Sequence, residues 1–143
     1  LHACALDASG NVWCWGAGDR GQLGNGQFAD ATTPAAVHMP PATVFADLAC
    51  SGRSCCGQDA AGRVFCWGAN DAAQLGIGEG PDRSEPTQTL LPGGTQVSAL
   101  AVGGAHVCVL TVDSAVWCWG QGAEGQLGQG GTQSSAVPVR VLP

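Results

Sequence analysis

The sequence predicts an all-β protein assembled from the blades of a β-propeller, each blade made of four short antiparallel strands. Three observations support this. Sequence landmarks recur with a period of 52 residues along the 143-residue chain, which indicates a repeat architecture. The chain contains 23 Gly and 8 Pro, which disfavour long helices and favour short strands joined by turns. Four strand-like segments also fit within one period, as a propeller blade requires.

The repeat is defined by a Trp-Gly pair followed seven residues later by a Gln-Leu-Gly segment. We expect a single partial propeller with repeats at residues 1–41, 42–93 and 94–143, or about 2.75 blades of 52 residues. The motif positions are His2, Trp15, Gly16, Gln22, Leu23 and Gly24 in the first repeat, Trp67, Gly68, Gln74, Leu75 and Gly76 in the second, and His106, Trp119, Gly120, Gln126, Leu127 and Gly128 in the third.

The number of repeats bears on how the propeller is completed. A closed propeller has about 4–8 blades, so 2.75 repeats are expected to form part of a larger ring. The alternative is that several copies of the chain associate through their open blade edges.

Each repeat is expected to begin with a tight hairpin. Folding the first repeat about a three-residue loop that ends at Gly10 places Cys4 opposite Cys14 on the paired strand. The last loop position favours a positive φ, which glycine adopts readily, and Gly62 occupies it in the second repeat. Ser114 occupies it in the third repeat, and we expect it to strain or reshape that turn.

The cysteines are expected to form disulfides. Residues opposed in a non-hydrogen-bonded pair lie within disulfide reach, so each hairpin should carry one cross-strand bridge. Cys50 and Cys55 lie outside the repeat and flank a short turn, which favours a local bridge; a vicinal Cys55–Cys56 bridge or a free thiol is the alternative. The expected pairs are Cys4–Cys14, Cys56–Cys66, Cys108–Cys118 and Cys50–Cys55.

The remaining strands follow from local composition. The second hairpin strand carries bulky rings on the face opposite its cysteine, so the sheet should be covered on both faces. A strand headed by proline is expected at residues 34–39, 86–91 and 138–142, where proline suits the first or an edge position. A further strand is expected at residues 44–50 and 97–102.

Cysteine content and charge limit the location and the partners. Eight Cys favour an oxidising compartment, so we expect a secreted, extracellular or cell-surface protein, with the periplasm as an alternative. The spacing of the cysteines lacks the CxxC or CxxH pattern typical of zinc sites. The net charge of −6 argues against nucleic-acid binding, and no apolar stretch is long enough to span a membrane.

No catalytic, metal-binding or cofactor-binding residues are predicted. His2 and His106 share one repeat position, which favours a hydrogen-bonded structural role, and His38 is isolated. A metal site or a catalytic base would need convergent partners, which the spacing does not supply. Asp7 and Asp59 head hairpin turns and are expected to bond the turn backbone, with calcium binding as the alternative.

The motif residues resemble a known family. The first repeat reads His-Ala-Cys-Ala-Leu from His2, then Trp15-Gly16, then a Gly-Gln-Leu-Gly segment from residue 21. This pattern resembles the RCC1 (regulator of chromosome condensation) repeat, in the Cys-paired form of secreted bacterial proteins. The second repeat departs from the pattern at Ser54, Gln58 and Ala73. The resemblance implies the propeller fold but says little about function, because the family ranges from exchange factors to enzyme inhibitors.

The predicted function is a non-enzymatic, exported protein–protein interaction scaffold. Its variable segments, residues 27–33, 79–85 and 131–136, follow each Gly-Gln-Leu-Gly turn, and binding sites concentrate in such loops on rigid frames. One alternative is a carbohydrate-binding module that uses exposed Trp, although most of the Trp positions recur with the fold motif. The other alternative is a structural element of an extracellular fibre or assembly.

Overall fold

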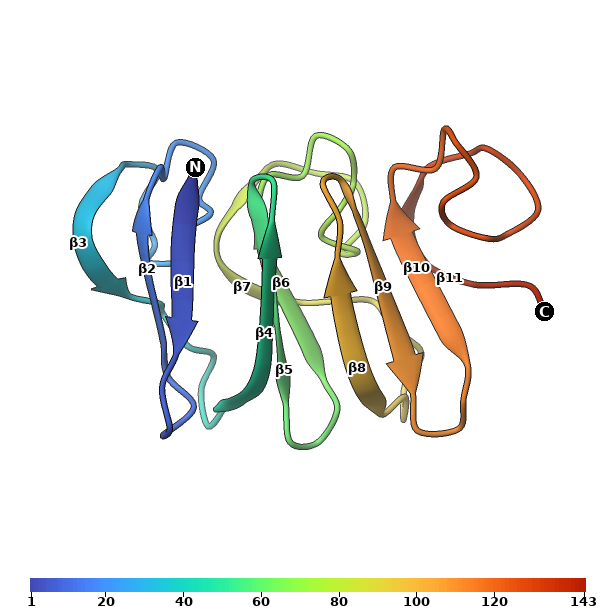
Figure 1. Cartoon of the computed structure of the whole chain (residues 1–143), viewed down its shortest axis with the longest axis horizontal. Helices are drawn as coiled ribbons and strands as arrows, with labels where there is room; N and C mark the ends of the chain where they lie inside the picture. The colour runs from blue at the N-terminus through green and yellow to red at the C-terminus, as the bar shows by residue number, and fades with distance from the viewer.

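The computed structural model describes residues 1–143 as eleven β-strands in three antiparallel sheets that lie side by side (Figure 1). Each sheet is a meander whose consecutive strands are neighbours. There is no helix that could cross a membrane. The first sheet contains β1 (His2–Leu6), β2 (Val12–Gly16) and β3 (Ala31–Ala36); the second contains β4 (Phe45–Ser51), β5 (Ser54–Asp59), β6 (Val64–Gly68) and β7 (Arg83–Gln88); the third contains β8 (Val97–Val102), β9 (His106–Thr111), β10 (Val116–Gly120) and β11 (Ser135–Arg140). The prediction of an all-β fold built of antiparallel blades is therefore confirmed, with four strands in the second and third sheets and three in the first.

The hairpins have the predicted register. Cys4 lies opposite Cys14, with their Cα atoms 4.1 Å apart. In the third hairpin the Ser114 N–H donates to the Thr111 carbonyl at 3.0 Å, as the Gly10 N–H does to the Asp7 carbonyl in the first. The turn thus keeps its shape, and Ser114 adopts φ 67° in the left-handed region. Of the two expected effects, strain or a reshaped turn, the structure therefore shows strain.

The proline-containing strands begin earlier than predicted. β3, β7 and β11 start three residues before their proline, so Pro34 lies within β3 rather than at its head. The reason is an irregularity in the pairing: Gly16 pairs with Ala31 and Cys14 with Ala35, so Trp15 faces several residues at a bulge. Proline is tolerated there because β3 is an edge strand and the bulge already interrupts the ladder.

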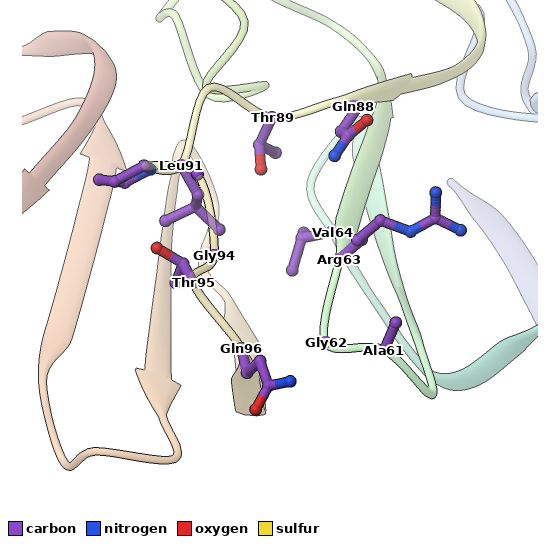
Figure 2. Close-up of a pocket in the computed structure, with 12 residues that line it drawn as sticks. Ala61, Gly62, Arg63, Val64, Gln88, Thr89, Leu91, Gly94, Thr95 and Gln96 are labelled. Atoms are coloured by element: carbon purple, nitrogen blue, oxygen red, sulfur yellow. The ribbon is translucent and has the colours of Figure 1, made fainter.

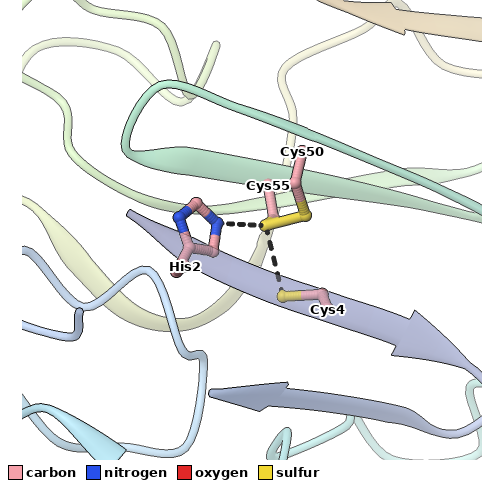
Figure 3. A group of neighbouring side chains, drawn as sticks. All are labelled: His2, Cys4, Cys50 and Cys55. Carbon is pink, nitrogen blue, oxygen red and sulfur yellow. Dashed lines mark hydrogen bonds between the residues drawn. A yellow bond between two sulfur atoms is a disulfide. The ribbon is translucent and has the colours of Figure 1, made fainter. Parts of the chain in front are cut away.

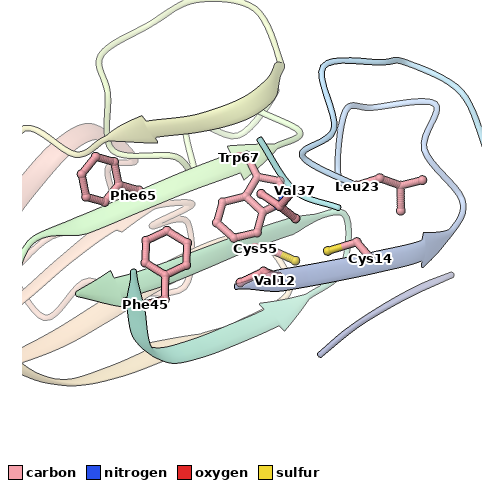
Figure 4. Close-up of a cluster of buried hydrophobic side chains, with 8 residues drawn as sticks. All are labelled: Val12, Cys14, Leu23, Val37, Phe45, Cys55, Phe65 and Trp67. Atoms are coloured by element: carbon pink, nitrogen blue, oxygen red, sulfur yellow. The ribbon is translucent and has the colours of Figure 1, made fainter. Parts of the chain in front are cut away.

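The sheets pack face to face through two apolar clusters. The first cluster joins the cysteine face of the first sheet to the ring-bearing face of the second, where Phe45 stacks on Trp67 with ring centroids 6.0 Å apart (Figure 4). The second cluster joins the opposite face of the second sheet to Trp119 and its neighbours on the third. The second sheet is therefore covered on both faces, which places Trp67 and Trp119 in the core with no exposed surface.

Candidate functional site

The long loops all lie at one end of the three sheets. The loops that follow β2, β6 and β10 are at the upper end in Figure 1, together with the β4–β5 and β8–β9 turns. The β1–β2, β5–β6 and β9–β10 turns lie at the other end. We call residues 17–30, 51–54, 69–85, 103–105 and 121–134 the loop end. It contains seven of the eleven carboxylates of the chain and three of the five arginines, so it is acidic.

The Gln-Leu-Gly motif forms the base of each loop. The Gln22 side chain accepts a hydrogen bond from the Arg20 N–H at 2.7 Å and donates to Asp19 at 3.1 Å. Its backbone carbonyl accepts a hydrogen bond from Nε1 of Trp67, on the next sheet, at 3.1 Å. The following Leu23 is fully buried. The motif therefore fixes its own loop and also joins that loop to the neighbouring sheet.

The same joint recurs between the second and third sheets. Nε1 of Trp119 donates to the Gln74 carbonyl at 3.0 Å. Gly76 has φ 66°, and a Cβ atom placed on it would lie 2.7 Å from Nε1 of Trp119. Glycine is needed here both for the backbone conformation and for the close approach of the ring.

Each loop is closed where the chain returns to the sheet. The side chain of Asp30 accepts a hydrogen bond from the Gly18 N–H at 2.9 Å, and that of Asp82 accepts one from the Asn70 N–H at 2.8 Å. The Ser134 hydroxyl accepts from Gly122 in the same way. The variable segments 27–33, 79–85 and 131–136 overlap or adjoin these closures and are mostly exposed. The loop end thus presents different residues on one repeated, hydrogen-bonded base.

One arginine joins the loops of two repeats. The Arg20 guanidinium forms ion pairs with Asp71, at 3.2 Å, and with Asp82. The hydrogen bond from Arg20 lowers the pKa of the Asp82 carboxyl below its usual value, whereas Gln74 is the largest cause of the lowered pKa of Asp71. Sequence reasoning missed this cluster, because the residues equivalent to Arg20 are not basic and the ion pairs are not part of the repeat.

The hairpin aspartates hold their turns. Oδ1 of Asp7 accepts hydrogen bonds from the N–H groups of Ser9 and Asn11, at 2.8 and 3.0 Å. The bond from Asn11 is the largest cause of a lowered pKa at Asp7. Asp59 accepts the Arg63 N–H at 2.8 Å in the same manner. The lone pairs of these carboxylates are engaged by the turn itself.

The structure contains four disulfides and no free cysteine: Cys4–Cys14, Cys50–Cys55, Cys56–Cys66 and Cys108–Cys118. The first two come together at the joint between the first and second sheets (Figure 3). Sγ of Cys4 lies 3.6 Å from Sγ of Cys55, and Nε2 of His2 lies 3.1 Å from the same sulfur.

This sulfur cluster is structural in its oxidised state. Zinc is bound by thiolates, and both sulfurs nearest to the His2 ring are consumed in disulfides. Burial lowers the pKa of His2, which favours the neutral ring. A neutral ring with a proton on Nε2 donates a weak hydrogen bond to sulfur. His38, in contrast, lies apart from the sulfurs and pairs with Glu85 of the next repeat at 2.9 Å.

The tryptophans do not form a shared exposed platform. Trp67 and Trp119 are fully buried, and Trp15 and Trp117 are half-buried. Trp13 alone is exposed, at 41%, and its Nε1 lies 3.4 Å from a carboxylate oxygen of Asp7. A sugar-binding surface that stacks several rings is therefore not built by these residues.

Comparison with known proteins gives consistent relatives. Residues 9–57, 61–110 and 113–143 match the family model described as the regulator of chromosome condensation (RCC1) repeat. The chain is 33% identical over 141 residues to the Ultraviolet-B receptor UVR8 of Arabidopsis thaliana, a match that covers 98% of this chain and 32% of the relative. It is 34% identical over 142 residues to the probable E3 ubiquitin-protein ligase HERC3 of Homo sapiens, covering 99% of this chain and 14% of that protein.

Solved structures share the fold. Human WBSCR16 superposes with a TM-score of 0.88 at 28% identity, covering 99% of this chain and 36% of that one. Yeast RCC1 (Prp20), solved bound to Kap60, has a TM-score of 0.88 at 21% identity and covers 99% and 35%. The chain therefore spans about a third or less of the length of the proteins it matches.

Proposed function

The chain belongs to the RCC1 repeat family, and we propose that it is a non-enzymatic, exported scaffold whose loop end binds a protein partner. One observation carries the proposal: exposed loops of different sequence lie on a repeated base, in which the side chain of the motif glutamine accepts a backbone N–H two residues earlier in all three loops. The base is held by Gln22 and Gln74, whose carbonyls accept the indole N–H of the next sheet. A rigid frame with variable loops is the usual arrangement of a binding surface.

Known members supply a precedent for protein binding. Yeast RCC1 was solved bound to Kap60, and its histone-binding and Gsp1p-binding properties were studied alongside a second structure. Those partners belong to that protein, and at 21–22% identity the likeness concerns the fold. The proposal for this chain rests on its own loop end.

The charge of the loop end suggests the chemistry of the partner. Asp19, Asp71, Glu79, Glu85 and Glu124 are exposed there. Complementary charge steers association and favours the correct partner, so we infer a protein with a basic patch. Association should then weaken as the salt concentration rises.

Two features support export and a non-enzymatic role. Four disulfides within 143 residues fit an oxidising compartment, where such bonds persist. Two of the titratable groups near the loops are engaged in ion pairs, Arg20 with two carboxylates and His38 with Glu85. A general base instead needs a free lone pair directed at a substrate.

The test is a set of loop exchanges. Residues 27–29, 79–81 and 131–133, the parts of the variable segments outside the loop closures and the strands, are replaced, singly and together, by Gly-Ser segments of equal length. The control replaces Ala60 and Ala61 with Ser in the hairpin turn at the opposite end. Proteins secreted by the source organism are captured on the immobilised chain and identified, and each purified candidate is then titrated. We expect a partner whose affinity falls at least tenfold in a loop variant and is unchanged in the control. Equal binding by the triple-loop variant would contradict the proposal.

A further inference from the structure

A polar cavity lies on the second sheet, away from the loop end. It has a volume of about 270 Å³ and lies between the β5–β6 hairpin turn and the linker from β7 to β8 (Figure 2). Its walls include Arg63, Val64, Gln88, Thr89, Leu91 and Gln96.

Thr89 places an unpaired hydroxyl in this cavity. The residue is only 6% exposed, and its Oγ1 has no hydrogen-bond partner in the protein. Figure 2 shows the oxygen directed into the space between Val64 and Thr95. Buried hydroxyls are almost always hydrogen-bonded, so a group that bonds this oxygen from within the cavity would remove an energetic cost.

The repeat shows that this hydroxyl is one of a set of local changes. The residues of the first repeat that lie 52 positions earlier are Ala36, Val37 and Val44, all apolar, and Val37 is a core residue. The second repeat has Gln88, Thr89 and Gln96 at the same three positions, and all three line the cavity. Of the three, only Thr89 takes the place of a core residue, because Ala36 and Val44 are exposed, as are Gln88 and Gln96. A threonine in the place of a core valine does not improve the sheet core, but it is suited to a bound polar molecule.

The linker also opens one wall of the cavity. The Pro41 and Ala42 of the first repeat are replaced here by Gly93 and Gly94. A Cβ atom placed on either glycine would meet nothing within 4 Å, so the backbone there faces open space. Backbone without side chains allows a ligand to approach closely.

We propose that this cavity binds a small, neutral, polyhydroxylated molecule, namely a monosaccharide unit. The Thr89 hydroxyl and the amides of Gln88 and Gln96 can each donate and accept, which matches the hydrogen-bonding pattern of sugar hydroxyls. The half-buried Leu91 offers apolar surface to a sugar's C–H groups. The ligand is neutral because the Arg63 guanidinium is bonded through Nε to Asp59 at 2.6 Å and extends away from the cavity (Figure 2).

The experiment uses the whole oxidised chain and four sugars with one simpler polyol: glucose, galactose, mannose, N-acetylglucosamine and glycerol. Each is titrated while the backbone amide signals are followed by NMR. We expect saturable shifts at residues 88–96 with at least one sugar, weaker shifts with glycerol, and at least a tenfold loss of affinity in Thr89→Val and in Gln96→Val. Both changes restore the residue of the first repeat, so the variants should fold.

The matched control is Thr87→Val, which changes the threonine two residues earlier, on β7 and outside the cavity, and should bind like the wild type. Thermal unfolding of Thr89→Val checks folding, since removal of a buried unpaired hydroxyl should leave the protein at least as stable. The absence of saturable shifts with every sugar would overturn the proposal, as would undiminished binding by Thr89→Val. The loop exchanges should leave sugar binding unchanged, so this site and the protein-binding loop end can fail independently.

Discussion

Replacement of Gly76 by alanine tests the joint between the second and third sheets. Gly76 has φ 66°, and an added Cβ would lie 2.7 Å from Nε1 of the fully buried Trp119. The left-handed conformation costs an L-residue about 1–2 kcal/mol, and overpacking a buried contact costs about 1–3 kcal/mol. Gly76→Ala should therefore lower the free energy of unfolding by about 2–5 kcal/mol. A displaced ring would also lose its hydrogen bond to the Gln74 carbonyl.

Gly78 provides the matched control. Its φ of 88° is also left-handed, but the nearest atom to an added Cβ is Cδ1 of Leu90 at 3.9 Å, an ordinary contact. Gly78→Ala should therefore cost only the backbone strain, about 1–2 kcal/mol. The assay is urea unfolding with the disulfides intact, and the difference between the two midpoints isolates the contact with Trp119. If the two variants agreed within about 0.5 kcal/mol, the indole would not rest against Gly76 and the reasoning would be refuted.

Three further predictions concern charge, backbone strain and covalent bonds. The hydrogen bond from Arg20 depresses the pKa of Asp82 in the folded state. The stabilisation that this carboxylate contributes is therefore present above its unfolded pKa of about 4 and is lost as pH falls through the lower folded value. In urea unfolding across pH 2–7, the unfolding free energy of Asp82→Asn should fall less steeply with acidification than that of the wild type, and identical pH dependence would contradict this. Ser114→Gly should raise the unfolding free energy by about 0.5–1 kcal/mol, because it removes left-handed strain at φ 67°, and a loss of stability in thermal unfolding would contradict it. Replacing Cys108 and Cys118 together by alanine should cost about 2–3 kcal/mol, since their bridge spans a sequence separation of 10, and an unchanged urea midpoint would contradict that.

The fold was predictable where its causes are local in sequence. The hairpin that pairs Cys4 with Cys14 follows from a loop of fixed length, and the second and third hairpins repeat it. The start of β3 was not predictable from Pro34, because the strand gains its first residues from a bulge opposite Trp15. That irregularity depends on how the loop returns to the sheet, which local propensity does not encode.

The functional residues were harder to predict because they depend on contacts between sheets. The hydrogen bond from Trp67 to the Gln22 carbonyl joins residues 45 positions apart. The motif alone does not identify the group that donates to this carbonyl. Arg20 reaches Asp82 across the same joint. A position-by-position comparison of the repeats could have pointed to Thr89, since a polar residue replaces the core Val37 there.

The placement of the disulfides has a mechanical consequence. All four bridges join strands of the same sheet, and none crosses from one sheet to another. Under tension applied to its ends, the chain should therefore behave as three internally cross-linked sheets connected by the linkers at residues 37–44 and 89–96. The sheets would separate first where the indoles of Trp67 and Trp119 leave their carbonyls, and the cross-linked hairpins would remain short after the joints had parted.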